Sequence, residues 1–418
     1  MENITLFKLP AEKGRWVLVV LGLLINLCLG SIYSWSVFVN PLMDYFTNTL
    51  GHDVSANEIL MPFSVFLACF AIAMPLAGKY IEEWGPRNTA IVGGILTGTG
   101  WILASMTDSV GMLYIVYGII GGIGVGIAYG VPVAVAARWF PDRRGLAVGL
   151  AVLGFGFSAF LTANAADFLI KDFGVMNTFR IFGIAFIFLI VLFALPLRFP
   201  PSGWMPPGYV PPLDKDGEYC ECTRDNMLKT KTFYGLFICY FIGCTAGLMA
   251  ISIAKPVGTE MAGVAPALGT LLVGFFAIFN GFGRPFFGSL SDRLNPSNTA
   301  IISFVLIAVA SFAIWFLPSV PVYIVSFALL WGCLGGWLAI APAATGRFFG
   351  TCDYPRCYGV VFLAYGAGAL AGPQIAGFIK TTTGGYADVF LLVTVLSLIG
   401  IAIAGLFMKP QKNDSLKK

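Results

Sequence analysis

The sequence contains twelve apolar runs, each long enough to cross a bilayer as a helix, which needs roughly 20 mainly apolar residues. Only 11% of the residues are charged, so lipid must cover most of the surface. We therefore predict an all-α membrane protein with twelve transmembrane helices. The predicted spans are residues 16–42, 57–78, 88–107, 111–137, 145–170, 178–197, 232–255, 267–288, 298–317, 321–345, 357–379 and 386–408.

Lysine and arginine residues are distributed unevenly between the two sides that these spans define. Twenty of them lie on the side of the N-terminus, whereas the opposite side holds Lys171, Arg180, Lys255 and Lys380. Cytoplasmic segments carry the excess of such residues, so both termini are expected to be cytoplasmic. The first run is too long for the apolar part of a signal peptide. We expect a multi-pass protein of the cell membrane, and the lack of glycosylation motifs in the predicted outer loops suits a bacterial inner membrane.

A polar segment divides the spans into two sets of six. Residues 198–231 are rich in proline and then in charge, as expected of a linker between residues 1–197 and residues 232–418. The two halves resemble each other at a spacing of 210 residues, since the segment from Gly78 to Pro86 answers to that from Gly288 to Pro296. Parallel six-helix repeats indicate a secondary transporter built from two pseudo-symmetric bundles.

The repeated segment carries a recognisable loop motif. Gly78, Glu82 and Arg87 fit the pattern G-x-x-x-(D/E)-x-x-G-x-R, and Gly288 and Asp292 begin a second copy. This pair resembles the cytoplasmic loop motif of the major facilitator superfamily, and the resemblance implies that fold. We expect the acids to form charge-assisted bonds that lock the cytoplasmic side, and the glycines to let helices approach closely. An ordinary charged turn is the simpler alternative. The predicted gating residues are Gly78, Glu82, Arg87, Arg138, Gly288, Asp292, Arg293 and Arg347.

Within that superfamily the chain is similar to the oxalate/formate antiporter family and to monocarboxylate transporters. The features that carry the resemblance are the string from Asn26 to Phe38, the string from Arg138 to Ala147, and Gly283-Arg284. The resemblance extends over all twelve spans. It implies a carrier of small carboxylates that works by alternating access.

Arg284 is the one charge well inside a predicted span. A charge near a helix centre costs roughly 2.5 to 3.5 kcal/mol, so this side chain should face the bundle or a wet cavity. Its guanidinium stays protonated and matches the geometry of a carboxylate. No acidic residue lies deep in any span to pair with it, which predicts an anionic substrate. The alternative is an arginine near the cytoplasmic end that extends to water.

Two departures from the resembled families concern the coupling proton and the substrate. Animal monocarboxylate transporters carry an aspartate, their favoured proton carrier, where Asn280 stands, and asparagine cannot titrate. The oxalate carrier has a lysine close to the position of Tyr365, whereas this chain has no basic residue between Arg356 and Lys380. One buried cation balances one carboxylate, so we expect a monocarboxylate such as lactate, pyruvate or formate rather than oxalate.

Polar and aromatic residues at a similar depth are candidates for the rest of the binding site. Tyrosine hydroxyls and the indole N–H bond polar groups of a ligand, and ring faces cover apolar ones. Packing within the bundle is an equally good interpretation for each of them. Besides Arg284, the predicted substrate-binding residues are Asn26, Tyr33, Tyr129, Phe155, Asn280, Trp337 and Tyr365.

Other functions find little support in the sequence. The chain has a single histidine, His52, in a polar loop, and no cysteine spacing typical of zinc, so we expect no metal. There is no Walker motif, no basic run for nucleic acid and no catalytic constellation, so we expect no cofactor and no enzyme. The leading hypothesis is a monomeric, proton-coupled monocarboxylate transporter. The alternatives are an oxalate/formate-type exchanger and a receptor that binds a carboxylate without moving it.

Overall fold

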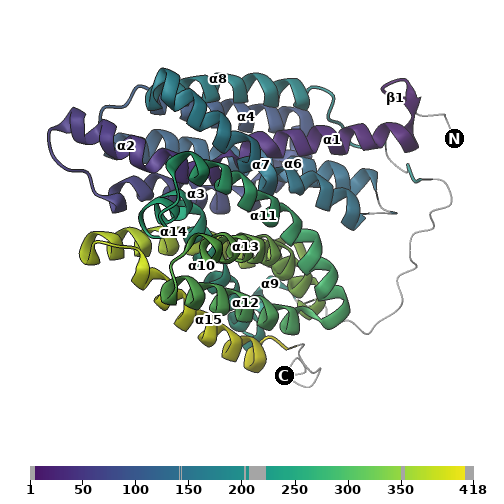
Figure 1. Cartoon of the computed structure of the whole chain (residues 1–418). Coiled ribbons are helices and arrows are strands. Elements are labelled where there is room, and N and C mark those ends of the chain that lie inside the picture. Colours follow the sequence, from purple (N-terminus) through teal and green to yellow (C-terminus); the bar gives the residue numbers. More distant parts are fainter. Residues whose placement is uncertain are drawn as a thin grey trace.

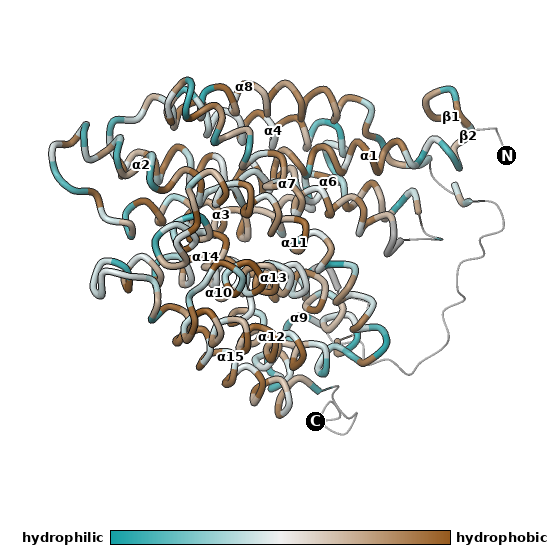
Figure 2. Tube along the Cα trace, viewed as in Figure 1, coloured by the Kyte–Doolittle hydropathy of each residue, from teal (hydrophilic) through white to brown (hydrophobic). Residues whose placement is uncertain are grey.

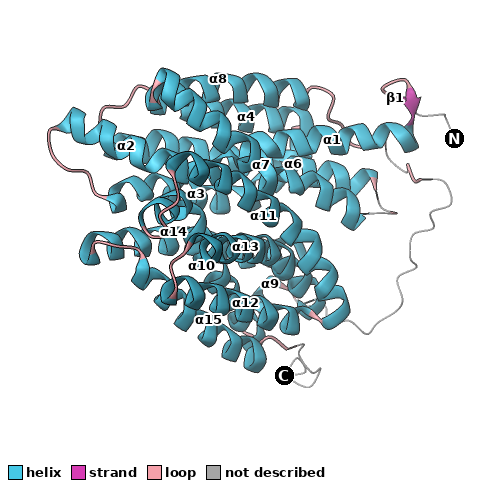
Figure 3. Cartoon of the chain, in the orientation of Figure 1, coloured by secondary structure: helices cyan, strands magenta, loops and turns pink. Residues whose placement is uncertain are grey.

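The computed structural model of the chain is almost entirely helical, with one short strand pair near the N-terminus (Figure 3). It describes residues 5–140, 142, 144–201, 204–206, 223–349 and 354–409. The elements are β1 (Thr5–Leu6), β2 (Leu9–Pro10), α1 (Ala11–Leu29), η1 (Gly30–Ser34), α2 (Trp35–Leu50), α3 (Ala56–Glu83), α4 (Gly85–Ala104), α5 (Val110–Leu113), η2 (Tyr114–Gly121), α6 (Gly122–Trp139), α7 (Arg144–Phe173), α8 (Val175–Ala194), α9 (Arg224–Met227), α10 (Lys231–Glu260), α11 (Pro266–Leu294), α12 (Pro296–Phe316), α13 (Val320–Phe349), α14 (Tyr354–Thr383) and α15 (Ala387–Phe407).

The predicted spans correspond to helices in this structure. Within the described residues, eleven helical segments are long and apolar enough to cross a membrane. The remaining predicted span, residues 88–107, corresponds to α4, which is less apolar because it contains several glycines and threonines. Those glycines place its backbone directly against neighbouring helices: a Cβ on Gly93 would lie 2.7 Å from the backbone of α6, and one on Gly98 would lie 2.5 Å from that of α8. The all-helical membrane architecture predicted from the sequence is confirmed.

The first span is not a single regular helix. Its two α-helices, α1 and α2, are joined by the 3₁₀ segment η1, so residues 11–50 form one interrupted rod. At this break α1 comes very close to α7, because a Cβ on Gly30 would lie 2.3 Å from the carbonyl oxygen of Phe155. A 3₁₀ stretch within a helix often marks a functional hinge. This one carries Tyr33 into the centre of the bundle.

The helices form two groups, which we call the first group (α1 to α8) and the second group (α10 to α15). In Figure 1 the first group, in purple to teal, lies above most of the second group, in green to yellow. The β1 strand and the C-terminal end of α15 lie at the same end of the bundle, which we call the termini end; the opposite end is the far end. Hydrophobic residues follow the helices, and hydrophilic residues gather at loops and helix ends (Figure 2). Which end is cytoplasmic stays a prediction, as do the domain boundaries.

The two groups meet mainly along two helix pairs, α3 with α14 and α7 with α11. At the far end these pairs are in close contact, since a Cβ on Gly377 of α14 would lie 2.6 Å from the Cα of Asn57 of α3. At the termini end, by contrast, a Cβ on Gly78 of α3 or on Gly149 of α7 would meet no described atom within 4 Å. The groups are therefore in close contact at the far end. Toward the termini end, α3 and α14 still touch where a Cβ on Gly359 would lie 3.2 Å from Pro75, and open space begins only beyond this point.

Candidate functional site

Arg284 lies in the contact between α11 and α7, midway along the bundle. Its side chain belongs to a residue that is only 5% exposed, and its Nη1 donates to the carbonyl oxygen of Val152 at 2.8 Å. Its Nε and Nη2 have no hydrogen-bond partner among the described residues. The guanidinium carbon is 6.0 Å from the ring centre of Phe155. The side chain thus points into the protein rather than extending along the helix surface to water.

Asn280 lies one helical turn before Arg284 on the same helix. Its Nδ2 donates to the carbonyl oxygen of Trp331 in α13 at 3.0 Å, which ties two helices of the second group together. Its Oδ1 is buried and has no partner among the described residues. That oxygen faces α7, because a Cβ on Gly156 would lie 2.7 Å from it. Asn280 therefore presents an acceptor to the first group.

Two tyrosines meet across the groups next to this crossing. The hydroxyl of Tyr33, in η1, is 3.0 Å from the hydroxyl of Tyr365, in α14, and both side chains are fully buried. Phe155 packs edge-on against Tyr33, with ring centres 5.1 Å apart. The same Phe155 ring lies 6.0 Å from the guanidinium carbon of Arg284, so it stands between the arginine and Tyr33. A cation, two hydroxyls and an aromatic face are thus brought together from α11, η1, α14 and α7.

Tyr129 of α6 completes this group of residues and is only partly buried. Its ring centre is 5.3 Å from that of Phe155 and 5.1 Å from that of Phe70 in α3. Phe70 also contacts Tyr365, at 5.8 Å. Phe70 was not among the predicted site residues, and with 15% aromatic residues in the chain no sequence signal distinguishes it.

Two further predicted site residues make their contacts within their own groups. The ring of Trp337 stacks 6.1 Å from Tyr240 of α10 and packs 5.0 Å from Phe304 of α12, so it lies within the second group. Asn26 donates to the carbonyl oxygen of Ala151 at 2.8 Å and so ties α1 to α7 within the first group. Asn26 was open to two interpretations, substrate binding and packing between helices, and this bond matches packing between helices.

The chemistry of the centre suits an anion. Within the described residues Arg284 forms no ion pair, and its Nε and Nη2 are buried without a hydrogen-bond partner, with the Phe155 ring 6.0 Å from the guanidinium carbon. A carboxylate is the partner that matches a guanidinium in charge and geometry. Among the described residues, no group of three or more His, Cys, Asp or Glu side chains is placed to hold a metal ion.

The predicted gating residues lie at the termini end and are mostly exposed. Glu82 of α3 forms an ion pair with Arg138 of α6 within the first group. Arg347, at the end of α13, lines a cavity of about 230 Å³ together with Lys409 and polar residues around the start of α12. Arg87, Asp292 and Arg293 are exposed and form no ion pair with any described residue.

The close helix approach expected at the two motif glycines is absent. A Cβ on Gly78 would meet nothing within 4 Å in the described part of the chain, and one on Gly288 would meet only Ala339, at 3.7 Å. The reason is that the groups are separated at this end. In this conformation Gly78 borders open space, and Gly288 leaves room for a Cβ in ordinary contact with Ala339 rather than marking a tight crossing.

Sequence reasoning also missed a second buried arginine. Arg15, just before the first predicted span, donates from Nη1 and Nη2 to the carboxylate of Asp142 at 2.6 and 2.8 Å. Asp142 belongs to the string from Arg138 to Ala147 that carries the family resemblance, which was the available signal. Arg284 is therefore distinguished by its lack of an acidic partner, not by burial alone.

Comparisons with known proteins agree with this geometry. The family model described as Major Facilitator Superfamily matches residues 19–209 and 236–418. The oxalate:formate antiporter of Oxalobacter formigenes is 30% identical, over 97% of this chain and 94% of the relative. Monocarboxylate transporter 12 of Xenopus laevis is 25% identical, over 94% of this chain and 88% of the relative.

Solved structures of transporters share the fold. A bacterial homolog of the human lysosomal transporter Spinster, in an inward-facing and occupied conformation, matches with a TM-score of 0.71 and 16% identity, over 95% of this chain and 97% of the other. A D-xylose-proton symporter matches with a TM-score of 0.70 and 14% identity, over 94% and 98%. At such identities the likeness concerns the arrangement of helices alone.

Proposed function

The chain is a multi-pass membrane protein that belongs to the major facilitator superfamily, and from this premise we propose that it is a secondary transporter of small monocarboxylates of the lactate or pyruvate type. Relatives that bear the names oxalate:formate antiporter and monocarboxylate transporter support a carboxylate as the substrate. The proposal includes transport by alternating access across a bacterial inner membrane, by a monomer whose termini are cytoplasmic.

The observation that carries the proposal is the state of Arg284. Its Nε and Nη2 are buried without a partner in the described part of the chain, which is costly for a charged group. A bound carboxylate supplies both the missing charge and the missing acceptors. Tyr365 stands close to where the oxalate carrier has a second cation, so the site balances one negative charge.

The site draws on both groups, as alternating access requires. Tyr33, Phe155 and Tyr129 come from the first group, whereas Arg284, Asn280 and Tyr365 come from the second. A substrate between them is released when the groups separate at either end. Asn280 cannot titrate, so in the proposed proton coupling the proton travels on the substrate carboxylate, on water, or on a group other than Asn280.

The test is uptake of radiolabelled lactate and pyruvate into proteoliposomes by the Arg284→Gln variant. Removing one partner of a buried charged pair costs about 2 to 5 kcal/mol, so uptake should fall by about 30-fold or more. Lys231→Gln, which removes an exposed charge at the start of α10, is the matched control and should transport normally. Normal uptake by a folded Arg284→Gln protein would overturn the site assignment.

A second candidate function is an oxalate/formate-type exchanger, favoured by the 30% identity to the antiporter of Oxalobacter formigenes. An exchanger needs a preloaded counter-anion and ignores an imposed pH gradient, whereas a proton-coupled transporter responds to the gradient without any counter-anion. The same proteoliposomes, loaded with formate or left empty, distinguish the two. Carboxylate binding without any uptake or counterflow would favour the receptor alternative.

A further inference from the structure

Asp167, near the far end of α7, joins helices of both groups. Its Oδ1 accepts a hydrogen bond from Nζ of Lys255 in α10 at 2.9 Å and another from Oγ1 of Thr270 in α11 at 3.0 Å. Its Oδ2 is 2.5 Å from Nζ of Lys171, four residues later on α7. One carboxylate of the first group thus binds two helices of the second group.

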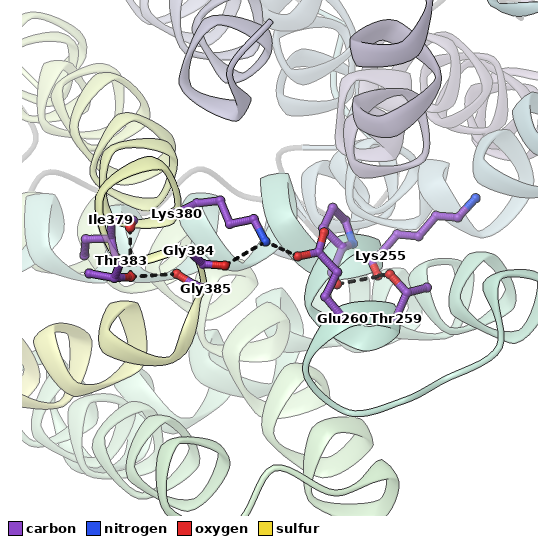
Figure 4. Close-up of polar contacts among 9 residues, drawn as sticks. Lys255, Thr259, Glu260, Ile379, Lys380, Thr383, Gly384 and Gly385 are labelled. Atoms are coloured by element: carbon purple, nitrogen blue, oxygen red, sulfur yellow. Dashed lines mark hydrogen bonds and ion pairs between the residues drawn. The ribbon is translucent and has the colours of Figure 1, made fainter. Parts of the chain in front are cut away.

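The bond to Lys255 is the only ion pair between the two groups among the described residues. A nearby pair at the far end, Glu260 with Lys380, joins α10 to α14 within the second group. Figure 4 shows Lys380 reaching Glu260, while the Lys255 side chain points away from that pair. Relative movement of the groups therefore breaks the Asp167 pair but leaves the Glu260 pair intact.

Burial makes this pair stronger than an ordinary surface ion pair. The side chains of Lys255 and Asp167 are only 14% and 17% exposed. Charges held in such surroundings are poorly screened, and loss of one partner leaves the other charge uncompensated. The pair therefore favours the conformation in which α7 touches α10 and α11 at the far end.

We propose that Asp167, with Lys255 and Thr270, is the gate that holds the far end closed. In each transport cycle these bonds break when the far end opens and form again when it closes. The proposal rests on the alternating access of the proposed function, but it requires neither Arg284 nor any particular substrate. Nothing else at the far end of the described chain combines opposite charges across the groups.

Hydrogen–deuterium exchange of the purified full-length protein in nanodiscs tests the gate without any substrate. The measured segments are residues 160–173 of α7 and 266–275 of α11, which face each other at the far end. Asp167→Asn and Lys255→Met should each raise exchange in both segments by about tenfold, a value between those for exposed and for fully buried pairs. Thr270→Val, which removes one neutral hydrogen bond, should produce a smaller increase.

Two control variants separate a gate from a merely stabilising ion pair. Lys171→Met removes the other partner of the same carboxylate, but within α7, and Glu260→Gln breaks the second-group pair at the same end. Both should leave exchange in the two segments as in the unmodified protein. The gate is refuted if either control raises exchange in the two segments as much as Asp167→Asn does. It is also refuted if Asp167→Asn and Lys255→Met both exchange like the unmodified protein.

The gate and the proposed function fail in distinguishable ways. Loss of lactate uptake in every preparation would refute the substrate but leave the exchange result standing. If Asp167→Asn does not fold, as judged by gel filtration, Lys255→Met and Thr270→Val carry the test alone. Unchanged exchange in both of those variants then refutes the proposal.

Discussion

The two ends of the bundle are held together in different ways. At the far end, contacts cross between the groups: Gly377 of α14 lies directly against Asn57 of α3, and Asp167 pairs with Lys255. At the termini end the pairs Arg15–Asp142, Lys79–Glu83 and Glu82–Arg138 each lie within the first group. The pairs α3–α14 and α7–α11 extend from one end of the bundle to the other. The two ends therefore differ in the contacts between these helices, and the neighbouring helices are the same.

For the proposed binding site, this contrast predicts access from the termini end. Tyr33 and Tyr365 are fully buried where the groups meet, whereas Tyr129 is only partly buried. The far end is closed by a few polar bonds and by a close contact at a small residue. In the proposed alternating access these contacts break, and contacts at the termini end form in their place. Substitutions that act on one end only are therefore the sharpest way to test the comparison.

The largest effect is expected from a bulky residue at the closed end. Gly377→Leu places a side chain where Asn57 lies within 2.6 Å, so α3 and α14 must separate. Overpacking of this kind costs about 3 kcal/mol of the free energy of unfolding. Thermal unfolding in detergent measures it, and the far-end segments should also exchange hydrogen faster.

Gly78→Leu is the matched control on the same helix pair. Its side chain would enter open space in this conformation, so the unfolding temperature should stay unchanged. Transport should nevertheless slow, because the added side chain obstructs closure at the termini end. Equal destabilisation by the two leucines would contradict the assignment of a closed and an open end.

Much of this fold could be predicted from the sequence, because membrane spans depend on run length and composition, which are local properties. Arg284 could be predicted for a similar reason, since a charge inside an apolar run is too costly to occur without a role. Tyr33 and Tyr365 were chosen by depth along their spans, and they do meet in the centre. Their roles in binding remain predictions.

Other features could not be derived because they depend on how helices face one another. Trp337 and Asn26 have a suitable depth, yet they turn toward helices of their own group, and depth does not fix the direction of a side chain. Asp167 and Lys255 lie at span ends, where charges are common, so nothing in the sequence indicates that they pair. The η1 break, which positions Tyr33, has no proline within it to announce it.

A smaller effect is expected from the buried ion pair at the termini end. Arg15→Gln removes two bonds to Asp142 and a cation over the ring of Phe140, 4.2 Å from its centre. Because Asp142 makes a further contact, its charge is not left wholly alone, and we expect a loss of about 2 kcal/mol. Thermal unfolding measures the loss. The far-end segments should keep their exchange rates, and faster exchange there would contradict the independence of the two ends.

The smallest effect on stability is expected from the exposed pair of the loop motif. The side chains of Glu82 and Arg138 are 58% and 42% exposed, and such pairs contribute less than about 1 kcal/mol. Glu82→Gln should therefore unfold at nearly the same temperature as the unmodified protein. If the motif acts as a gate, its effect should appear in the transport rate, because the bonds it makes matter when the termini end closes. A large fall in unfolding temperature would mean that Glu82 stabilises the first group itself. The Glu82 pair could then not be compared, as a gate, with the Asp167 bonds at the far end.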